Sequence, residues 1–505
     1  MKRRDFMKQA GCAAMGSTTL LSSLTNLKAF NGVLGKSSIS SPNPTDYKAL
    51  VCVLLAGGLD SYNLLVPTGN NIGGDNGYND YISVRTDLAI PRDDLLALSN
   101  PNEQPLCNGF GGLSCEYGSF GVHPSVTGIR DMFNDGNLAF MSNIGTLVEP
   151  IANFTEYNSK KRPLGLYSHA DQIMQWQTSV PQSRNALGVG GRFADLLHAA
   201  NSYEQISMNI SLSGKNVFQR GKDFAEYSIG NNINANNVGF ESLPSYWSNT
   251  GLLTQLRNAA VDSLVSQNYA NLLQNTYSAT AKQSIGSFEI FKEALKRVPS
   301  FNTVFPTTDL GNDLSAISKV IGVRNELGAK RQIFFVTIGG WDMHDNLLDG
   351  LNGRLPQVSQ ALKAFYDSTV ELGIADKVTT FTISDFARTI TSNGEGSDHA
   401  WGGNSMVMGG AVKGGKIYGS YPRMSVDNYD RNVSNRGHYI PALSTDELYA
   451  ELALWYGVSP YDLCYVLPNL GNFYSYAPNN YPVGFIDFAG TTVSSDNKPQ
   501  GCTTY

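Results

Sequence analysis

The chain has 505 residues, of which 41% are hydrophobic and 16% are charged, and its formal net charge is −6. This length is typical of one large domain or of about two to three small ones, and the apolar content is sufficient for a sizeable core. Basic residues are not in excess, which argues against nucleic acid as a partner.

The first 29 residues have the pattern of an export signal. Arg3 and Arg4 precede Phe6 and Lys8, and a mildly apolar run rich in Gly, Ser and Thr follows them. Paired arginines here are typical of twin-arginine signals, which are addresses and not part of the fold. We therefore expect residues 1–29 to be a signal peptide and the protein to be periplasmic or secreted. A basic tail on a cytosolic protein is the alternative, and the run is too short and too polar to predict a membrane span.

The remaining chain divides by composition. Residues 30–47 are rich in Ser, Asn and Pro and are predicted to be a linker. Residues 48–480 are predicted to form the domain, and residues 481–505 a C-terminal tail. Within the domain, the region from about residue 215 to 330 contains segments with the periodicity of amphipathic helices, so we interpret it as a helical insertion.

Apolar runs alternate with helical patterns along the domain. Residues 49–56 are continuously apolar, which is typical of a strand buried on both faces, and residues 332–338 and 378–383 predict two more strands. Helical patterns cover 355–372 and 446–456. This alternation predicts a mostly parallel sheet covered by helices on both faces, which is the α/β class. Shorter elements are predicted at 123–133 and 168–176 as helices and at 138–142 and 205–210 as strands.

The cysteines predict disulfides. After signal removal, Cys107 and Cys115 flank a glycine-rich loop, and Cys464 precedes a tail that ends near Cys502. In an oxidising compartment, Cys107–Cys115 and Cys464–Cys502 are the pairings we expect. Cys52 lies in a predicted strand and is expected to be a buried free thiol.

Three predicted strands are each followed by an aspartate. Asp60 and Asp342 come after Gly-Gly pairs, and Asp385 follows the third strand. Binding sites in open α/β sheets lie beyond the carboxyl ends of the strands. One such aspartate alone would be an ordinary turn or helix-cap residue, but three at strand ends favour a shared site.

Histidines lie close to these aspartates in the sequence. His344 is two residues beyond Asp342, so both side chains would point to the same side of an extended segment. Mixed carboxylate and imidazole ligands suit zinc, manganese or iron, whereas carboxylates with amide oxygens suit calcium or magnesium. The sequence therefore predicts a divalent metal site with the ligands Asp60, Asp342, His344, Asp385 and His399.

Other residues are candidates for catalysis or for lining the cleft. Arg388 could bind an anionic substrate oxygen bidentately, with a surface salt bridge as the alternative. Ser125 could be a nucleophile, and His123 a base or nucleophile, although His-Pro-Ser is also an ordinary helix start. His169, in the segment SHADQ, could line the cleft.

Several motifs together carry a family resemblance. They are RRxF at the N-terminus, GGLDSYN at 57–63, HP at 123–124, GGWDMH at 339–344, SDFART at 384–389, GSDHAWGG at 396–403 and GGAVKGG at 409–415. From about residue 48 to 460 the chain resembles a large family of exported bacterial proteins catalogued as a domain of unknown function, number fifteen-oh-one. That family is similar to the alkaline phosphatase-like superfamily of phosphatases, sulfatases and phosphomutases. The resemblance implies a three-layer αβα fold with one or two metals at the strand ends.

The resemblance also implies roles for particular residues. Asp60 matches the first metal-binding aspartate of the superfamily, and Asp385 matches its strand-end aspartate. Asp342 and His344 match its later Asp/His pair, and His399 matches its last histidine. Phe386 is a departure, because phosphatases and many sulfatases have a histidine or asparagine ligand there, so one metal could be absent or weakly held. The place of the nucleophile corresponds to Ser125, with His123 beside it.

These observations predict an exported metal-dependent hydrolase of phosphate or sulfate esters, acting on a small molecule or a carbohydrate. The alternative is a non-catalytic relative that keeps the fold and serves a surface, assembly or carbohydrate-binding role.

Overall fold

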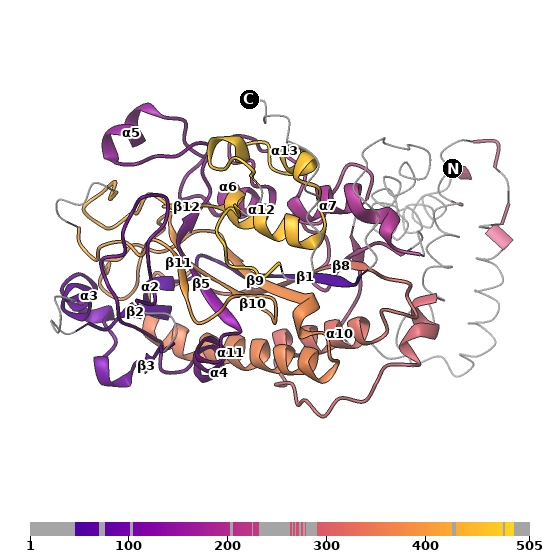
Figure 1. Ribbon diagram of the computed structural model, residues 1–505, viewed down its shortest axis with the longest axis horizontal. Coiled ribbons are helices and arrows are strands. Elements are labelled where there is room, and N and C mark those ends of the chain that lie inside the picture. The colour runs from indigo at the N-terminus through magenta and orange to yellow at the C-terminus, as the bar shows by residue number, and fades with distance from the viewer. Residues whose placement is uncertain are drawn as a thin grey trace, which may run out of the picture.

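A computed structural model describes residues 46–488, apart from 70–75, 101–104, 203–205, 225, most of 232–289, 427–430 and 478–479. One large sheet runs through these residues (Figure 1). Its strand order is β11 (Ile417–Gly419), β5 (Leu138–Gly145), β10 (Gly403–Met408), β9 (Val378–Ser384), β1 (Lys48–Ala56), β8 (Arg331–Gly339), β6 (Asn209–Ser211) and β7 (Tyr227–Ser228), and β12 (Leu443–Ser444) pairs with β5.

The sheet is mixed but mostly parallel. β1 pairs in parallel with β8 and with β9, and its residues from Lys48 to Ala56 lie opposite residues from Arg331 to Gly339. β10 runs antiparallel to β5 and to β9. The predicted strands β1, β8 and β9 are confirmed, whereas β10 is not among the predicted strands.

Helices cover both faces of the sheet (Figure 1). One layer contains α4 (Thr127–Asn134), α10 (Asp309–Gly322) and α11 (Leu347–Glu371), and the other contains α6 (His169–Thr178), α7 (Val189–Leu197), α12 (Thr445–Tyr456) and α13 (Leu463–Val466). Alternate side chains of β1 pack against the two helical layers, because successive residues of a strand point to opposite faces. Val51 and Val53 belong to the core cluster of α10 and α11, while Leu50 and Leu54 belong to that of α12. The predicted three-layer αβα architecture is confirmed.

The remaining elements are short. They are α2 (Ser61–Leu64), α3 (Gly77–Arg85), α5 (Phe154–Ser159) and a small sheet of β2 (Leu65–Pro67), β4 (Phe120–Val122) and β3 (Leu96–Ala97).

Local signals explain where the predicted helices begin and end. Ser444 caps α12, and the side chain of Glu447 accepts a hydrogen bond from Ser444 N at 2.9 Å, which completes a capping box. Gly457, with φ of 110°, ends the same helix. The helix predicted to begin at His123 begins instead at Thr127, because residues 123–126 form a turn closed by Val126 N and His123 O at 3.1 Å.

The region 215–330 shares the main core at its described ends. β7 extends the large sheet, and α10 packs on its face. Within this region residues 290–295 are helical, and most of residues 232–289 lies outside the described residues.

The structure answers part of the cysteine prediction. Cys107 and Cys115 form the predicted disulfide, with a Cα–Cα distance of 5.9 Å, and Cys52 is a buried free thiol. Cys464 is disulfide-bonded, and its predicted partner Cys502 lies outside the described residues, as does the predicted signal. None of the described helices is long and apolar enough to cross a membrane.

Candidate metal centre

The turns that follow β1, β8 and β9 meet at one edge of the sheet. Two glycines allow this approach, since Gly57 and Gly58 have φ of 124° and 80°. A Cβ on Gly57 would lie 2.6 Å from the backbone nitrogen of Asp342, and one on Gly58 would lie 2.5 Å from the ring of Phe386. The Gly-Gly pair before Asp60 thus brings three strand ends together.

The segment after β9 folds back on itself. Thr389 N donates to Asp398 O at 2.8 Å, and Ala400 N donates to Ala387 O at 2.7 Å. Arg388 and His399 are paired in an antiparallel bridge. This short hairpin places His399 back at the carboxyl end of β9, where Asp385 lies.

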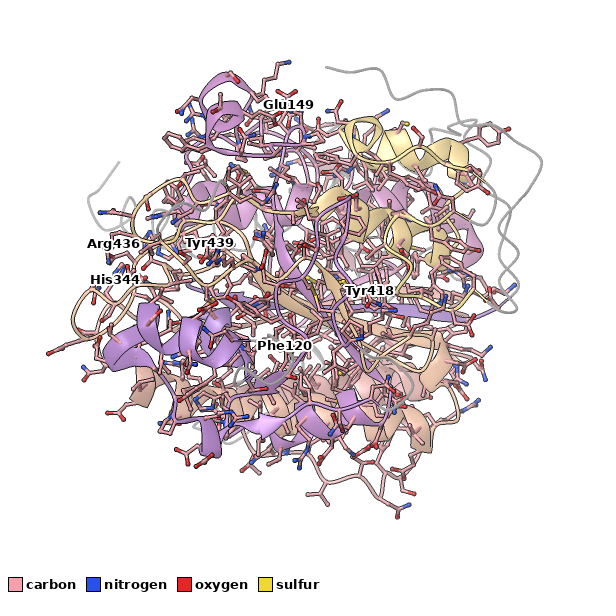
Figure 2. The ribbon with its side chains drawn as sticks, turned by 60° about the vertical axis from the view of Figure 1, so that its left-hand side comes forward. Phe120, Glu149, His344, Tyr418, Arg436 and Tyr439 are labelled. Carbon is pink, nitrogen blue, oxygen red and sulfur yellow. A yellow bond between two sulfur atoms is a disulfide. The ribbon has the colours of Figure 1, made fainter. Side chains whose placement is uncertain are left out.

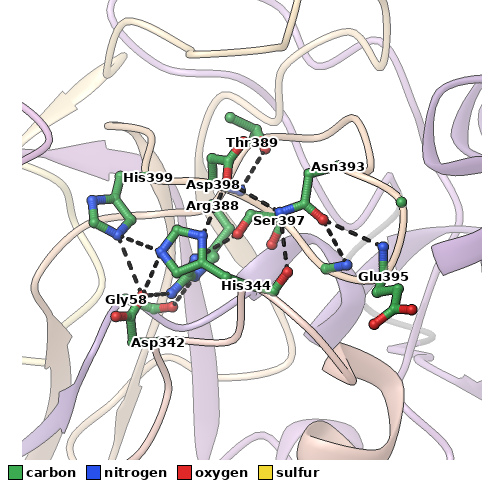
Figure 3. A network of polar contacts seen from close by, with 12 residues as sticks. Gly58, Asp342, His344, Arg388, Thr389, Asn393, Glu395, Ser397, Asp398 and His399 are labelled. Carbon is green, nitrogen blue, oxygen red and sulfur yellow. Dashed lines mark hydrogen bonds and ion pairs between the residues drawn. The ribbon is translucent and has the colours of Figure 1, made fainter.

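Three histidines and one aspartate bring potential ligand atoms together. The ligand atoms of His169, Asp342 and His399 all lie within 4.8 Å of one another. His344 adjoins them, because its Nε2 lies 2.9 Å from Nε2 of His399 and 3.0 Å from Oδ1 of Asp342 (Figure 3). We call these four residues the His–Asp cluster.

Each imidazole of the His–Asp cluster is held through its Nδ1. The partners are Asp385 Oδ2 at 2.7 Å from His169, Asp398 Oδ1 at 3.0 Å from His344 and the carbonyl oxygen of Tyr167 at 2.8 Å from His399. A carbonyl oxygen only accepts, so the hydrogen of a neutral His399 is on Nδ1 and the lone pair is on Nε2. Oxygen partners of this kind orient metal-binding histidines and raise their basicity.

Tyr167 is held in an unusual backbone conformation. Its φ is 71°, and its N–H donates to Oε1 of Gln172 at 2.5 Å. A non-glycine residue in the left-handed region costs about 1–3 kcal/mol, and such strain is found mainly where function requires it. Here it aims the carbonyl that orients His399.

One ligand atom of the cluster has no hydrogen-bond partner. Nε2 of His169 is buried and has no hydrogen-bond partner among the described residues, and its ion-pair contact with Oδ2 of Asp342 is 3.4 Å long. The ring of Phe386 packs against His169 and His399, with centroid distances of 4.7 and 4.5 Å. Phe386 is therefore an apolar wall behind two imidazoles at the position where the resemblance implies a ligand. A buried lone pair among nitrogen and carboxylate donors fits one metal ion.

The pKa values of Asp342 and His399 are shifted toward the protonation states that bind a metal. Burial alone would raise the pKa of Asp342, but the hydrogen bond and charge of Arg388 and the nearby His169 and His344 lower it. Burial lowers the pKa of His399, more than its bond to Tyr167 raises it. At neutral pH the cluster thus offers a carboxylate and a neutral imidazole.

Two predicted ligands have other partners in the structure. Both oxygens of Asp60 are engaged, since Oδ1 accepts from Asn63 N at 3.2 Å and Oδ2 forms a buried ion pair with Arg85. Asp385 accepts from Gly57 N at 3.0 Å and reaches the cluster through His169. The structure therefore brings Asp342, His344 and His399 together and places Asp385 behind them.

The predicted nucleophile pair lies beside Asp60. Nδ1 of His123 is 2.8 Å from Oγ of Ser125, and His123 N donates to Leu64 O at 3.1 Å. Burial lowers the pKa of His123 to about 4, although the Asp60 carboxylate opposes this shift. Among the described residues, His123 and Ser125 contact each other and the region around α2.

Arg388 faces the protein interior. Its side chain is fully buried and is bound by backbone carbonyls and by Asp342. Arg436, in contrast, lies partly exposed beside the cluster. It pairs with Asp398, and 37% of its side chain is exposed.

Sequence reasoning missed some residues that build the site. Asp398 is in a quoted motif, and its place next to His399 was an available signal. Tyr167 contributes a backbone carbonyl, which no side-chain pattern could show. His169, which the sequence predicts as a residue lining the cleft and not as a ligand, comes from the start of α6, more than 150 residues from the rest of the cluster.

Comparison with known proteins supports the family resemblance. Residues 276–439 match the family described as "Protein of unknown function (DUF1501)". This segment contains Asp342, His344, Asp385 and His399, and the match confirms the resemblance for the motifs at 339–344, 384–389, 396–403 and 409–415. Among curated proteins, none matches the chain.

The chain is also similar to solved structures at low identity. For Ps i-CgsB in complex with k-i-k-neocarrahexaose the TM-score is 0.32, with 10% identity over 84% of this chain and 74% of the other. For the lipoteichoic acid synthase LtaP from Listeria monocytogenes the TM-score is 0.27, with 7% identity and coverages of 81% and 79%. For the PsFucS1 sulfatase from Pseudoalteromonas sp. the values are 0.23, 11%, 80% and 68%.

Proposed function

We propose that the protein is an exported, metal-dependent hydrolase of phosphate or sulfate esters. The observation that carries the proposal is the convergence of imidazole Nε2 atoms on the carboxylate of Asp342, while each Nδ1 is held by an oxygen. In this proposal His169, Asp342, His344 and His399 hold one divalent ion.

The donor set narrows the choice of metal. Imidazole nitrogens with one carboxylate suit zinc, manganese or iron, whereas calcium and magnesium favour oxygen ligands. We therefore propose zinc, manganese or iron. A bound ion would polarise an ester oxygen and offset the charge that develops there.

The surroundings of the cluster suit an anionic ester that arrives from solvent. The side chains of Asp342 and His344 are each 45% exposed. Arg436 lies on the same side of the molecule as His344 (Figure 2), and its partly exposed guanidinium is available to a substrate oxygen. We assign to Arg436 the anion-binding role that the sequence suggested for Arg388.

We propose that water, and not a serine, attacks the ester. Ser125 is hydrogen-bonded to His123, and this pair lies beside the Asp60–Arg85 ion pair. A serine nucleophile needs a base and the reacting ester beside its hydroxyl. His123 would supply the base, but among the described residues no contact joins Ser125 or His123 to the His–Asp cluster, where the ester would be bound.

The test combines metal analysis with hydrolysis of aryl phosphate and aryl sulfate esters. We expect about one equivalent of zinc, manganese or iron per chain and turnover of at least one ester class. Asp342→Asn and His399→Ala should abolish both, whereas Ser125→Ala and the matched control His198→Ala should retain both. Turnover that is lost in Ser125→Ala at full metal content would contradict the proposed role of water. Metal without turnover of either ester would favour the non-catalytic alternative.

Export is tested separately. Replacement of Arg3 and Arg4 by lysine should leave the protein in the cytoplasm, whereas the parent chain should be recovered from the periplasm or medium. Equal distribution of the two proteins would contradict the proposed twin-arginine export.

A further inference from the structure

We propose that the guanidinium of Arg388 is a permanent cation within the site, which limits the centre to one metal ion and fixes the orientation of Asp342. This inference rests on the proposed metal-dependent function.

Five oxygens surround the guanidinium, and they come from separate turns. The fully buried Arg388 side chain donates from Nε to Gly58 O at 3.0 Å and from Nη1 to Ser397 O at 2.6 Å. Nη2 lies 3.2 Å from Gly57 O and 3.4 Å from Trp341 O, and it also pairs with Oδ1 of Asp342. The turns after β1 and β8 and the hairpin after β9 thus converge on one charged group (Figure 3).

Carbonyl and carboxylate oxygens in this arrangement are the ligands that a hard cation takes. In this chain an arginine occupies their centre, and an arginine keeps its charge at every physiological pH. A second metal ion at this position would have to displace a buried, hydrogen-bonded cation. The oxygen cage is therefore already filled by the chain itself.

The same contact sets the orientation of the Asp342 carboxylate. Oδ1 accepts from Arg388 and faces Nε2 of His344 and His399 at 3.0 and 3.3 Å. Oδ2 faces the unpaired Nε2 of His169 at 3.4 Å. With one oxygen held by the arginine, the plane of the carboxylate is fixed before any metal binds, so Arg388 is a positioning residue.

The neighbouring acids offer no second set of ligands. Asp60 is neutralised by Arg85, and Asp385 is used by His169 and by the Gly57 amide. Phe386 fills the adjacent position with an apolar ring. Among the described residues, the ligands that remain around Asp342 suffice for one ion.

The experiment counts bound metal by mass spectrometry of the intact native protein titrated with Mn²⁺ or Zn²⁺. The parent chain should bind one equivalent. Arg388→Gly, which empties the cage, should either accept a second Mn²⁺ or bind the first at least tenfold more weakly. Millimolar guanidinium should restore the parent behaviour, which a merely structural defect would not show. Arg354→Gly is the matched control, since Arg354 contacts Gly339 O at the same strand end, and it should bind as the parent does.

Two equivalents bound to the parent chain would overturn the inference, as would unchanged count and affinity in Arg388→Gly. If Arg388→Gly does not fold, the parent count and Arg388→Lys decide, and the lysine variant should keep one equivalent with weaker affinity. One bound metal without ester hydrolysis would refute the proposed function and leave this inference intact. Two bound metals with hydrolysis would do the reverse.

Discussion

Asp60 and Asp342 follow neighbouring parallel strands, and both come after a Gly-Gly pair. Their surroundings differ. Asp60 is 2% exposed and is paired with the buried Arg85, whereas the side chain of Asp342 is 45% exposed and has three imidazoles around it. The first carboxylate anchors the interior and the second is presented for binding. The residue type at a strand end locates a site, but the partners that the fold supplies decide its role.

Removing one charge of the buried pair should have the largest effect on folding. Asp60→Asn leaves Arg85 without its counter-charge, and breaking a buried pair from one side costs roughly 3–5 kcal/mol. We expect this loss in the free energy of unfolding, measured by denaturant titration, with metal affinity of the folded protein unchanged. Asp342→Asn is the comparison for metal binding and should lose the metal. Because Asp342 is also the counter-charge of the buried Arg388 but is itself 45% exposed, a smaller loss of stability is expected in this variant as well. Loss of metal at unchanged stability in Asp60→Asn would restore Asp60 as a ligand.

The same region should contribute to the response to acid. The pKa of His123 is about 4 in the folded protein and about 6.5 when unfolded, so between these pH values the unfolded chain binds the additional proton. Stability should therefore fall as pH drops from about 6.5 to 4, by about 1.4 kcal/mol per pH unit from this residue. His123→Asn should have a shallower dependence of melting temperature on pH over this window. Parallel curves for the two proteins would show that His123 is not buried in its neutral form.

Features of the two regions that depend on residues close in the sequence could be predicted, whereas contacts between distant residues could not. β1, β8 and β9 could be predicted because each is a local apolar run, and Asp342 and His344 could be grouped because they are two residues apart. The partner of Asp60 is Arg85 on α3, and nothing near Asp60 in the sequence indicates that pairing. β10 was missed because Gly403–Met408 is short and follows a glycine-rich loop, so its strand state depends on pairing with β5 and β9.

Removal of metal should separate the two regions further. A ligand present at 100 times its dissociation constant stabilises the folded state by about 2.7 kcal/mol. We expect a chelator to lower the melting temperature of the parent chain and of Asp60→Asn by similar increments, and to leave Asp342→Asn unaffected. A chelator effect that persists in Asp342→Asn would mean that the ion is bound elsewhere.

The smallest effect should come from the oxygens behind the imidazoles. Asp398 accepts from Nδ1 of His344 and is also bound by Asn393 and Arg436. Burial alone would raise its pKa, but these partners lower it, so it is a carboxylate that can orient the ring at neutral pH. Loss of such a partner typically weakens metal binding about 10–100-fold. Asp398→Asn should therefore bind zinc about 10–100-fold more weakly in a competition titration, while Asp345→Asn, which changes an exposed neighbour of His344, should bind as the parent does. Equal affinities in all three proteins would show that Asp398 does not orient a metal-bound imidazole of His344.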